Sequence, residues 1–147
     1  MKAVIEMPMG TRFKYEICKS TGKLLLDRPI KSKVPYNYGY IPNTLCDDGD
    51  AIDVFVVTLE PIPALTVVEI EIIGCIKGID GGRHDDKILA FVRGDDFARA
   101  AELMPTVVGQ IKAYLSTYKE GFVIGDLTSA EEAVKIVREA ELPGDSG

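Results

Sequence analysis

The sequence has no tryptophan, a single histidine and three cysteines among its 147 residues. Cys18, Cys46 and Cys75 show none of the paired spacing of a zinc site, and an odd number of cysteines does not form a complete disulfide framework. They are typical of free thiols in a reducing compartment, so we expect a cytoplasmic protein. A Ser-His-Asp or Cys-His enzyme would depend entirely on His84, which we interpret as an exposed loop residue.

Long apolar runs and an excess of positive charge are also absent. No stretch reaches the roughly 20 apolar residues of a membrane-spanning helix, and Glu6 and Arg12 interrupt any apolar signal peptide at the start. The formal net charge is −6, whereas nucleic-acid-binding domains are usually basic. We therefore expect neither a membrane nor a nucleic acid as a partner. An acidic chain can still bind an anion if metal ions reverse the local charge.

Glycine and proline are plentiful, with 14 and 8 copies, which favours many turns and short strands. The length is sufficient for one domain with its own core, so we predict a single domain over 1–147 with a flexible tail over 143–147. Strand patterns come first and helical patterns follow. This order predicts an α+β, mainly β fold that contains a small barrel.

Alternation of apolar and polar residues locates most of the predicted elements. Strands are predicted over 3–7, 12–18, 24–26, 54–57, 65–76 and 88–92, and helices over 95–103, 107–118 and 128–140. Ser129 and Glu132 fit a capping box at the start of the last helix. The tyrosine-rich segment 34–42 is predicted to be irregular because prolines and a glycine interrupt it, and 78–87 is predicted to be an acidic loop.

Four carboxylates fall within the seven residues 47–53, directly before the apolar strand 54–57. Carboxylates this close repel one another unless a cation or a shared proton intervenes. Oxygen donors without histidine or cysteine suit Mg²⁺, Mn²⁺ or Ca²⁺ better than Zn²⁺. An EF-hand register fails, because Thr44 and Cys46 would stand where acids belong. Taken alone, the segment is equally compatible with a solvated acidic turn.

Further charged residues lie on predicted strand ends and in glycine-bearing loops. The acids are Glu6, Glu16, Asp48, Asp50, Asp53, Asp80 and Asp85, the bases are Lys14, Arg28, Lys87 and Lys119, and Tyr38 and Tyr118 add neutral donors. Acids interleaved with cations indicate a site that binds several divalent metals together with a multiply charged oxyanion. Arginine and lysine are the side chains expected around such an oxyanion.

The segment Asp48-Gly49-Asp50-Ala51-Ile52-Asp53-Val54 resembles the Asp-x-Asp-Pro-x-Asp signature of the family I soluble inorganic pyrophosphatases. The match extends from about residue 3 to 119. It includes Val4-Ile5-Glu6-Met7-Pro8, Lys14-Tyr15-Glu16-Ile17, Leu26-Asp27-Arg28, Asn37-Tyr38-Gly39-Tyr40, Asp80 with Asp85 and Lys87, and Tyr118-Lys119. So many spaced polar motifs in the family's order do not arise by chance.

The resemblance implies hydrolysis of inorganic pyrophosphate to two orthophosphates by a metal-bridged water. Several Mg²⁺ ions serve as cofactors, with Mn²⁺ or Zn²⁺ as substitutes. Asp48, Asp53 and Asp85 resemble the ligands of the first metal, and Asp53 bridges to the second. Asp80 and Asp85 resemble the ligands of a third metal, and Glu6 and Glu16 join the metal or water contacts.

The remaining roles follow from the same resemblance. Asp50 is the expected catalytic base, and Tyr38 acts in catalysis and in phosphate binding. The groups that hold the two phosphoryl halves are Lys14, Arg28, Tyr38, Lys87, Tyr118 and Lys119. The implied architecture is a five-stranded barrel of the oligonucleotide-binding (OB) type with two or three helices outside. The implied assembly is a homo-oligomer, with a hexamer favoured.

Three positions depart from the family pattern. Ala51 replaces the common proline of the signature, and Gly81 follows Asp80 where bacterial members often carry an acid. Val34 stands where many members have a tyrosine, so an aromatic contact is lost or taken over by Tyr36. The segment after Lys119 is short and lacks a lysine- and tryptophan-bearing stretch.

Two other functions remain open at this point. One is a metal- or polyphosphate-binding module that does not turn over, which would not require Asp50. The other is an aspartyl-phosphate phosphatase that uses Asp48 and Asp50, although no apolar strand leads into Asp48.

Overall fold

The computed structural model describes residues 1–18, 20–29, 32–47, 49–94, 97–118 and 121–143. Of the predicted flexible tail 143–147, all but the first residue lies outside this description. Five strands form the centre of the fold: β1 (Lys2–Met7), β4 (Asn37–Ile41), β5 (Ile52–Val57), β8 (Lys87–Val92) and β6 (Val67–Asp80). The other elements are β2 (Phe13–Ile17), β3 (Leu24–Pro29), β7 (Arg83–His84), β9 (Phe122–Leu127), α1 (Phe97–Tyr118) and α2 (Ala130–Ala140).

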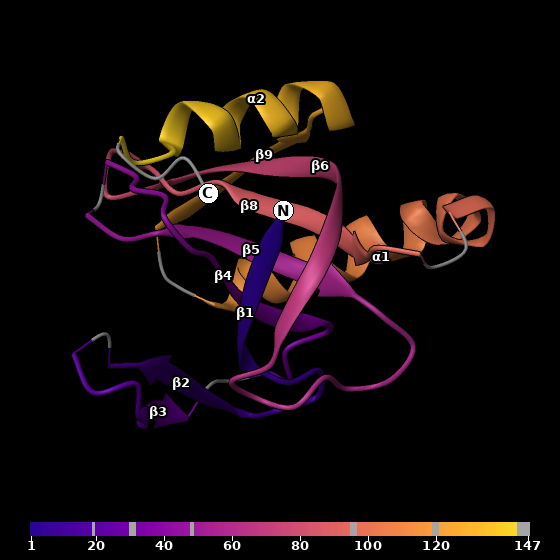
Figure 1. Ribbon diagram of the computed structural model, residues 1–147. Coiled ribbons are helices and arrows are strands. Elements are labelled where there is room, and N and C mark those ends of the chain that lie inside the picture. The colour runs from indigo at the N-terminus through magenta and orange to yellow at the C-terminus, as the bar shows by residue number, and fades with distance from the viewer. Residues whose placement is uncertain (19, 30–31, 48, 95–96, 119–120, 144–147) are drawn as a thin grey trace.

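The five central strands close into a ring (Figure 1). They are hydrogen-bonded in the order β1-β4-β5-β8-β6, and β6 returns to pair with β1. Strands β5 and β8 are parallel, and the other pairs in the ring are antiparallel. The ring of five strands confirms the predicted OB-type architecture. The hairpin β2–β3 projects from one end of the ring.

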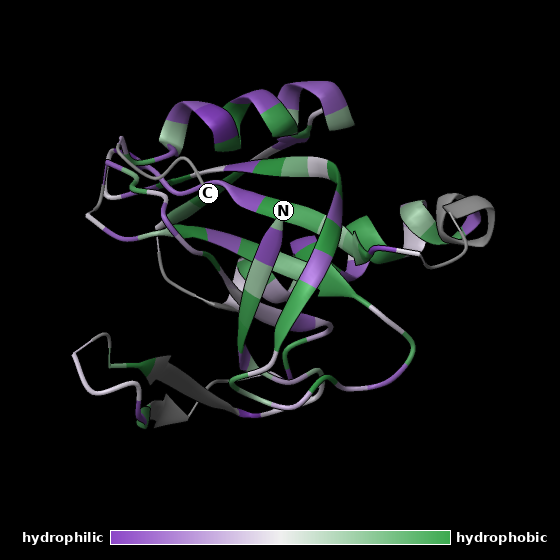
Figure 2. Cartoon of the chain, viewed as in Figure 1, coloured by the Kyte–Doolittle hydropathy of each residue, from purple (hydrophilic) through white to green (hydrophobic). Residues whose placement is uncertain are grey.

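Alternate residues of the strands are buried in two separate cores. One core contains Val54 and Val56 of β5 together with residues of every ring strand, and Ala133 and Val137 of α2 close it. The other contains Phe55 of β5 and the apolar face of α1. Figure 2 shows hydrophobic residues concentrated on the ring strands, while hydrophilic and hydrophobic residues alternate along α2. Strand β5 is therefore buried on both faces, which explains its continuous apolar run.

The segment 34–42 was predicted to be irregular, and this prediction is wrong over 37–41. These residues form β4, which pairs with β1 and β5. Gly39 makes the pairing possible, because a Cβ at this position would lie 1.8 Å from the carbonyl oxygen of Val4. A glycine that weakens a strand in isolation thus permits the close approach of two backbones.

The helices and strands of the second half also differ from the prediction. Instead of two helices over 95–103 and 107–118, a single helix α1 runs from Phe97 and continues through Pro105; residues 95 and 96 lie outside the description. The strand predicted over 65–76 runs from Val67 to Asp80, so the acidic loop begins later than predicted. Strand β9 was not predicted at all.

Helix α2 begins where the capping box predicted. The Ser129 hydroxyl accepts a hydrogen bond from the Glu132 backbone N–H at 3.2 Å. This bond satisfies one of the free N–H groups of the first turn. Within the described part of the chain, neither helix has the length and apolar character that crossing a bilayer requires.

Candidate active site

Lys87 is the centre of the candidate site. Its residue is only 1% exposed, and its Nζ donates hydrogen bonds to Asp53 Oδ2 at 2.6 Å, Asp85 Oδ1 at 2.9 Å and the Tyr38 hydroxyl at 3.0 Å. The sheet brings these groups together: Lys87 lies opposite Asp53 in the parallel β5–β8 pair, and Tyr38 lies on β4, the next strand of the ring. The protein thus buries an ammonium with two carboxylates as its counterions, the arrangement that buried charges require.

The two carboxylates around Lys87 influence each other. Burial is the main cause that raises the pKa of Asp85 above its ordinary value of 3.8, and the negative charge of Asp53 raises it further; Lys87 opposes both effects. Desolvation and a neighbouring like charge both favour the protonated carboxyl. Asp53 and Asp85 therefore form a pair that an additional cation would stabilise.

Three other predicted acids occupy described positions. Glu6 lies in an irregular step of the β1–β4 pairing, where its carboxylate accepts a hydrogen bond from the Ile17 N–H at 3.0 Å. The pKa of Tyr40 is raised mainly by burial and also by the charge of Glu6. Asp50 is exposed in the turn before β5. Asp80 is the last residue of β6 and pairs with Arg83 and Phe122.

For the other predicted site residues, the structure describes either the backbone alone or nothing. Asp48 and Lys119 lie outside the described residues. For Lys14, Glu16, Arg28 and Tyr118 the backbone is described but the side chains are not. The backbone register places Lys14 opposite Arg28 in the β2–β3 hairpin.

The described residues fit a divalent cation in their chemistry, although they do not complete a site for one. Among them, no three histidine, cysteine, aspartate or glutamate side chains gather in a group able to hold a metal ion. The described pair, Asp53 and Asp85, offers carboxylate oxygens only, the donors that Mg²⁺ prefers. Asp48, the third predicted ligand of the first metal, lies outside the description.

One aromatic residue near the site was not predicted from the sequence. Phe122, on the unpredicted strand β9, has its ring centre 5.9 Å from Lys87 Nζ, within cation–π range. The run Phe122 to Ile124 was the one sequence signal for this strand.

Tyr36, considered as a replacement for the tyrosine missing at Val34, donates a hydrogen bond to Gln110 of α1 at 2.6 Å. Val34 itself is buried in the core beside α1.

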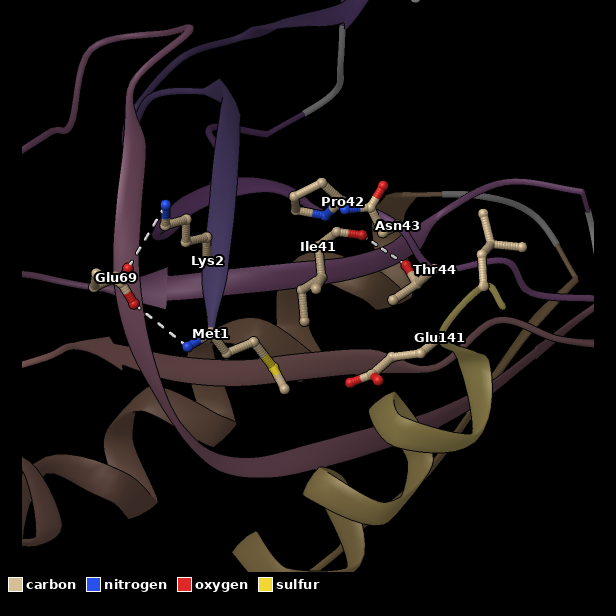
Figure 3. A pocket seen from close by; sticks show the side chains of 9 residues that line it. Met1, Lys2, Ile41, Pro42, Asn43, Thr44, Glu69 and Glu141 are labelled. Carbon is tan, nitrogen blue, oxygen red and sulfur yellow. Dashed lines mark hydrogen bonds and ion pairs between the residues drawn. The ribbon is translucent and has the colours of Figure 1, made fainter. Parts of the chain in front are cut away.

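A separate pocket of about 400 Å³ lies where β1 meets the segment after β4 (Figure 3). Its charged groups are largely paired, since Glu69 binds the N-terminal amine at 3.3 Å and Lys2 at 4.0 Å. Among the predicted site residues whose side chains the structure describes, none lines this pocket. The chemistry of the candidate site is therefore at Lys87 and not in this pocket.

Comparison with known proteins identifies relatives over most of the chain. The family model described as inorganic pyrophosphatase matches residues 3–142. "Soluble inorganic pyrophosphatase 2" of Chlamydomonas reinhardtii is 38% identical over 95% of this chain and 78% of its own length. "Inorganic pyrophosphatase" of Campylobacter jejuni subsp. jejuni serotype O:2 is 34% identical over 95% of this chain and 89% of its own length.

Solved structures give the same result. An inorganic pyrophosphatase from Neisseria gonorrhoeae superposes with a TM-score of 0.86 at 31% identity and covers 95% of this chain and 88% of its own. The inorganic pyrophosphatase from Thermus thermophilus has a TM-score of 0.86 at 28% identity, with the same two coverages of 95% and 88%. The sequence motifs, the five-stranded ring and these relatives agree: the chain belongs to the family I inorganic pyrophosphatases.

Proposed function

We propose that this chain, as a single catalytic domain, hydrolyses inorganic pyrophosphate to two orthophosphates with the help of Mg²⁺ ions. The observation that carries the proposal is the contact of Lys87 with Asp53, Asp85 and Tyr38 in a chain of this family. A metal-dependent enzyme is consistent with the family, and the preference for Mg²⁺ over Mn²⁺ or Zn²⁺ is part of the proposal.

The acids divide into metal-holding and proton-accepting groups. Asp48, Asp53, Asp80 and Asp85, together with Glu6 and Glu16, would hold the metal ions. When bound, divalent ions supply positive charge to the phosphoryl oxygens and acidity to the attacking water. Asp50 accepts the proton of that water, and its exposed position before β5 supports access to solvent.

The basic residues and tyrosines hold the substrate. Lys14, Arg28, Lys119, Tyr38 and Tyr118 would donate hydrogen bonds to the phosphoryl oxygens, and Lys87 would help to hold the substrate through its positive charge. The water oxygen forms a bond to one phosphorus while the bond from that phosphorus to the bridging oxygen breaks. Charge that moves to the leaving phosphate is then stabilised by fixed donors, which need no reorganisation during the step. The buried ammonium of Lys87 supplies a fixed positive charge, because hydrogen bonds to Asp53, Asp85 and Tyr38 hold it in place.

The assembly and the compartment are also proposals. We propose a homo-oligomer, with a hexamer favoured, in the cytoplasm. Exposed aliphatic side chains such as Leu59 and Val123 support burial of surface between subunits. The free thiols of Cys18, Cys46 and Cys75 support a reducing compartment.

Phosphate release from pyrophosphate by the purified chain with Mg²⁺ tests the function. We expect Asp50→Asn to lower kcat by about 100-fold or more, because a general base contributes at least that factor. Asp47→Asn is the matched control, since Asp47 is an exposed acid of the same turn with no role in the proposal. No release by the parent chain would reject the enzyme in favour of a binding module without turnover. Equal losses in both variants would reject Asp50 as the base.

A further inference from the structure

The hydroxyl of Thr44 connects the two strands that lead into and out of the acidic turn. Thr44 is 4% exposed. Its Oγ1 donates to the Ile41 carbonyl oxygen at 2.6 Å and accepts from the Ile52 N–H at 2.9 Å. Figure 3 shows the first of these bonds. Ile41 and Ile52 face each other at the end of the β4–β5 pairing. The hydroxyl thus bridges two buried backbone groups at the point where the ladder ends.

The position of this bridge matters for the candidate site. Ile52 is followed directly by Asp53, whose carboxylate accepts from Lys87 at 2.6 Å. Residues 42–51, which carry Asp50, form the connection that the hydroxyl closes. The start of β5 is therefore anchored by Thr44 on one side and by pairing with β8 on the other.

Thr44 is itself held from outside the ring. The Leu45 N–H donates to the Ala140 carbonyl oxygen at 2.9 Å, and the Leu142 N–H donates to the Asn43 carbonyl oxygen at 2.9 Å. These bonds form a bridge between Thr44 and Glu141. The segment that follows α2 thus pairs with the segment that precedes the acidic turn, and this pairing holds the backbone on both sides of Thr44.

We propose that Thr44 is a positioning residue that sets the location of Asp53 for metal binding. This inference rests on the proposed function, because it assigns Asp53 to a metal. Without the hydroxyl, the Ile41 carbonyl and the Ile52 N–H lose their buried partner and must move toward other groups. A shift at Ile52 moves Asp53 with it, and metal affinity is sensitive to the groups that orient a ligand.

Mn²⁺ binding in the absence of substrate tests the proposal. Electron paramagnetic resonance counts free Mn²⁺ and requires no turnover. Thr44→Val keeps the shape and removes both hydrogen bonds, whereas Thr44→Ser keeps the hydroxyl. Thr58→Val is the matched control: Thr58 follows the other end of β5, and its hydroxyl also has two partners, Asn37 Nδ2 at 2.7 Å and the Glu60 carbonyl oxygen at 2.6 Å.

We expect Thr44→Val to bind Mn²⁺ about tenfold more weakly than the parent chain, because outer groups that orient ligands contribute at least this factor. Thr44→Ser and Thr58→Val bind as the parent does. Unchanged binding in Thr44→Val overturns the proposal, and so does equal weakening in Thr58→Val, since the effect is then general loss of stability. If the parent chain itself binds no Mn²⁺, the proposed metal dependence fails together with the role of Thr44. This outcome differs from one in which the parent chain binds Mn²⁺ and Thr44→Val binds it equally well, which rejects the role of Thr44 alone.

A measurement on the parent chain covers the case in which Thr44→Val does not fold. Metal binding at Asp53 stabilises the bridge by linkage, so saturating Mg²⁺ slows hydrogen exchange of the Ile52 amide. The Ile62 amide, bonded to Asn37 Oδ1 at 2.8 Å near the opposite end of β5, serves as the internal control and slows less. Equal slowing at both amides, or no slowing at Ile52, rejects the proposal.

Discussion

Lys87 illustrates, at the residue scale, how a charge is accommodated inside the protein. The residue is only 1% exposed, and its ammonium contacts Asp53, Asp85 and Tyr38. Each partner is needed by the others, because a lone charge in this environment would be far costlier than the pair. Asp85 is also buried, and this burial raises its pKa.

Asp85 predicts a pH dependence of stability in the absence of metal. Its pKa is raised in the folded chain, so its contribution to stability is present below the unfolded pKa and is lost as pH rises through the folded pKa. Asp85→Asn has no proton to lose. The variant loses a counterion of Lys87 at every pH. We therefore expect the difference in free energy of unfolding, variant minus parent, to rise with pH from about pH 4 upward. Urea unfolding in EDTA at several pH values measures the difference; parallel curves would contradict the prediction.

The side-chain amide of Asn37 makes four hydrogen bonds, so its removal is expected to lower stability strongly. Its Nδ2 donates to the Val56 carbonyl and to Thr58, and its Oδ1 accepts from the backbone N–H groups of Met9 and Ile62. We expect Asn37→Ala to lower the free energy of unfolding by about 3 kcal/mol, because several polar groups lose their partner at once. Thr58→Val removes one of these contacts and is expected to cost about 1 kcal/mol. Similar losses in the two variants, measured in urea, would argue against this account.

At the scale of elements, α1 and β4 show tertiary packing that overrides local preference. Pro105 is exposed and lies inside α1, although proline disfavours a helix interior. The burial of Val107, Ile111 and Leu115 against the sheet stabilises the following turns. In β4, glycine disfavours a strand, but the close approach of Gly39 to the backbone of Val4 allows β4 to pair with β1.

Gly39 and Gly109 predict opposite effects of the same substitution. A Cβ on Gly39 would overlap the backbone of Val4, so Gly39→Ala must separate β1 from β4. We expect a loss of about 3 kcal/mol in the free energy of unfolding. Gly109 lies in α1 with open space around it, and Gly109→Ala is expected to gain about 1 kcal/mol from helix propensity. Thermal and urea unfolding measure both changes, and a tolerated Gly39→Ala would disprove the tight approach of the strands.

For the whole molecule, metal binding and stability are linked. A metal that binds only the folded chain stabilises it by about 2.7 kcal/mol at 100 times its dissociation constant. For a chain of this size we expect Mg²⁺ to raise Tm by about 5–10 °C. Asp53→Asn should abolish the shift and Asp47→Asn should retain it. Calorimetry with and without Mg²⁺ measures the effect, and an equal shift in both variants would place the metal elsewhere.

The assembly is tested on the same scale by light scattering of the purified chain. We expect the mass of a hexamer, because subunit contacts would remove exposed aliphatic side chains from water. A monomeric mass over a range of concentrations would reject the proposed assembly.

Local chemistry determined much of this protein from its sequence alone. Alternating residues located most strands, the Ser129 capping box located α2, and the charged motifs indicated a pyrophosphatase with its candidate residues. The strands and the helix cap depend on side chains only a few positions apart, where spacing and composition are sufficient. The pyrophosphatase assignment instead depends on the resemblance of motifs from about residue 3 to 119 to a known family.

Only the tertiary structure decided the features that join distant segments. Gly39 lies in a strand because β1 approaches it, and α1 continues past Pro105 because its later turns pack on the sheet. Lys87 joins Asp53 and Asp85 because β5 and β8 run side by side in parallel register. Such contacts depend on which backbones meet in space, and no local pattern of residues contains that information.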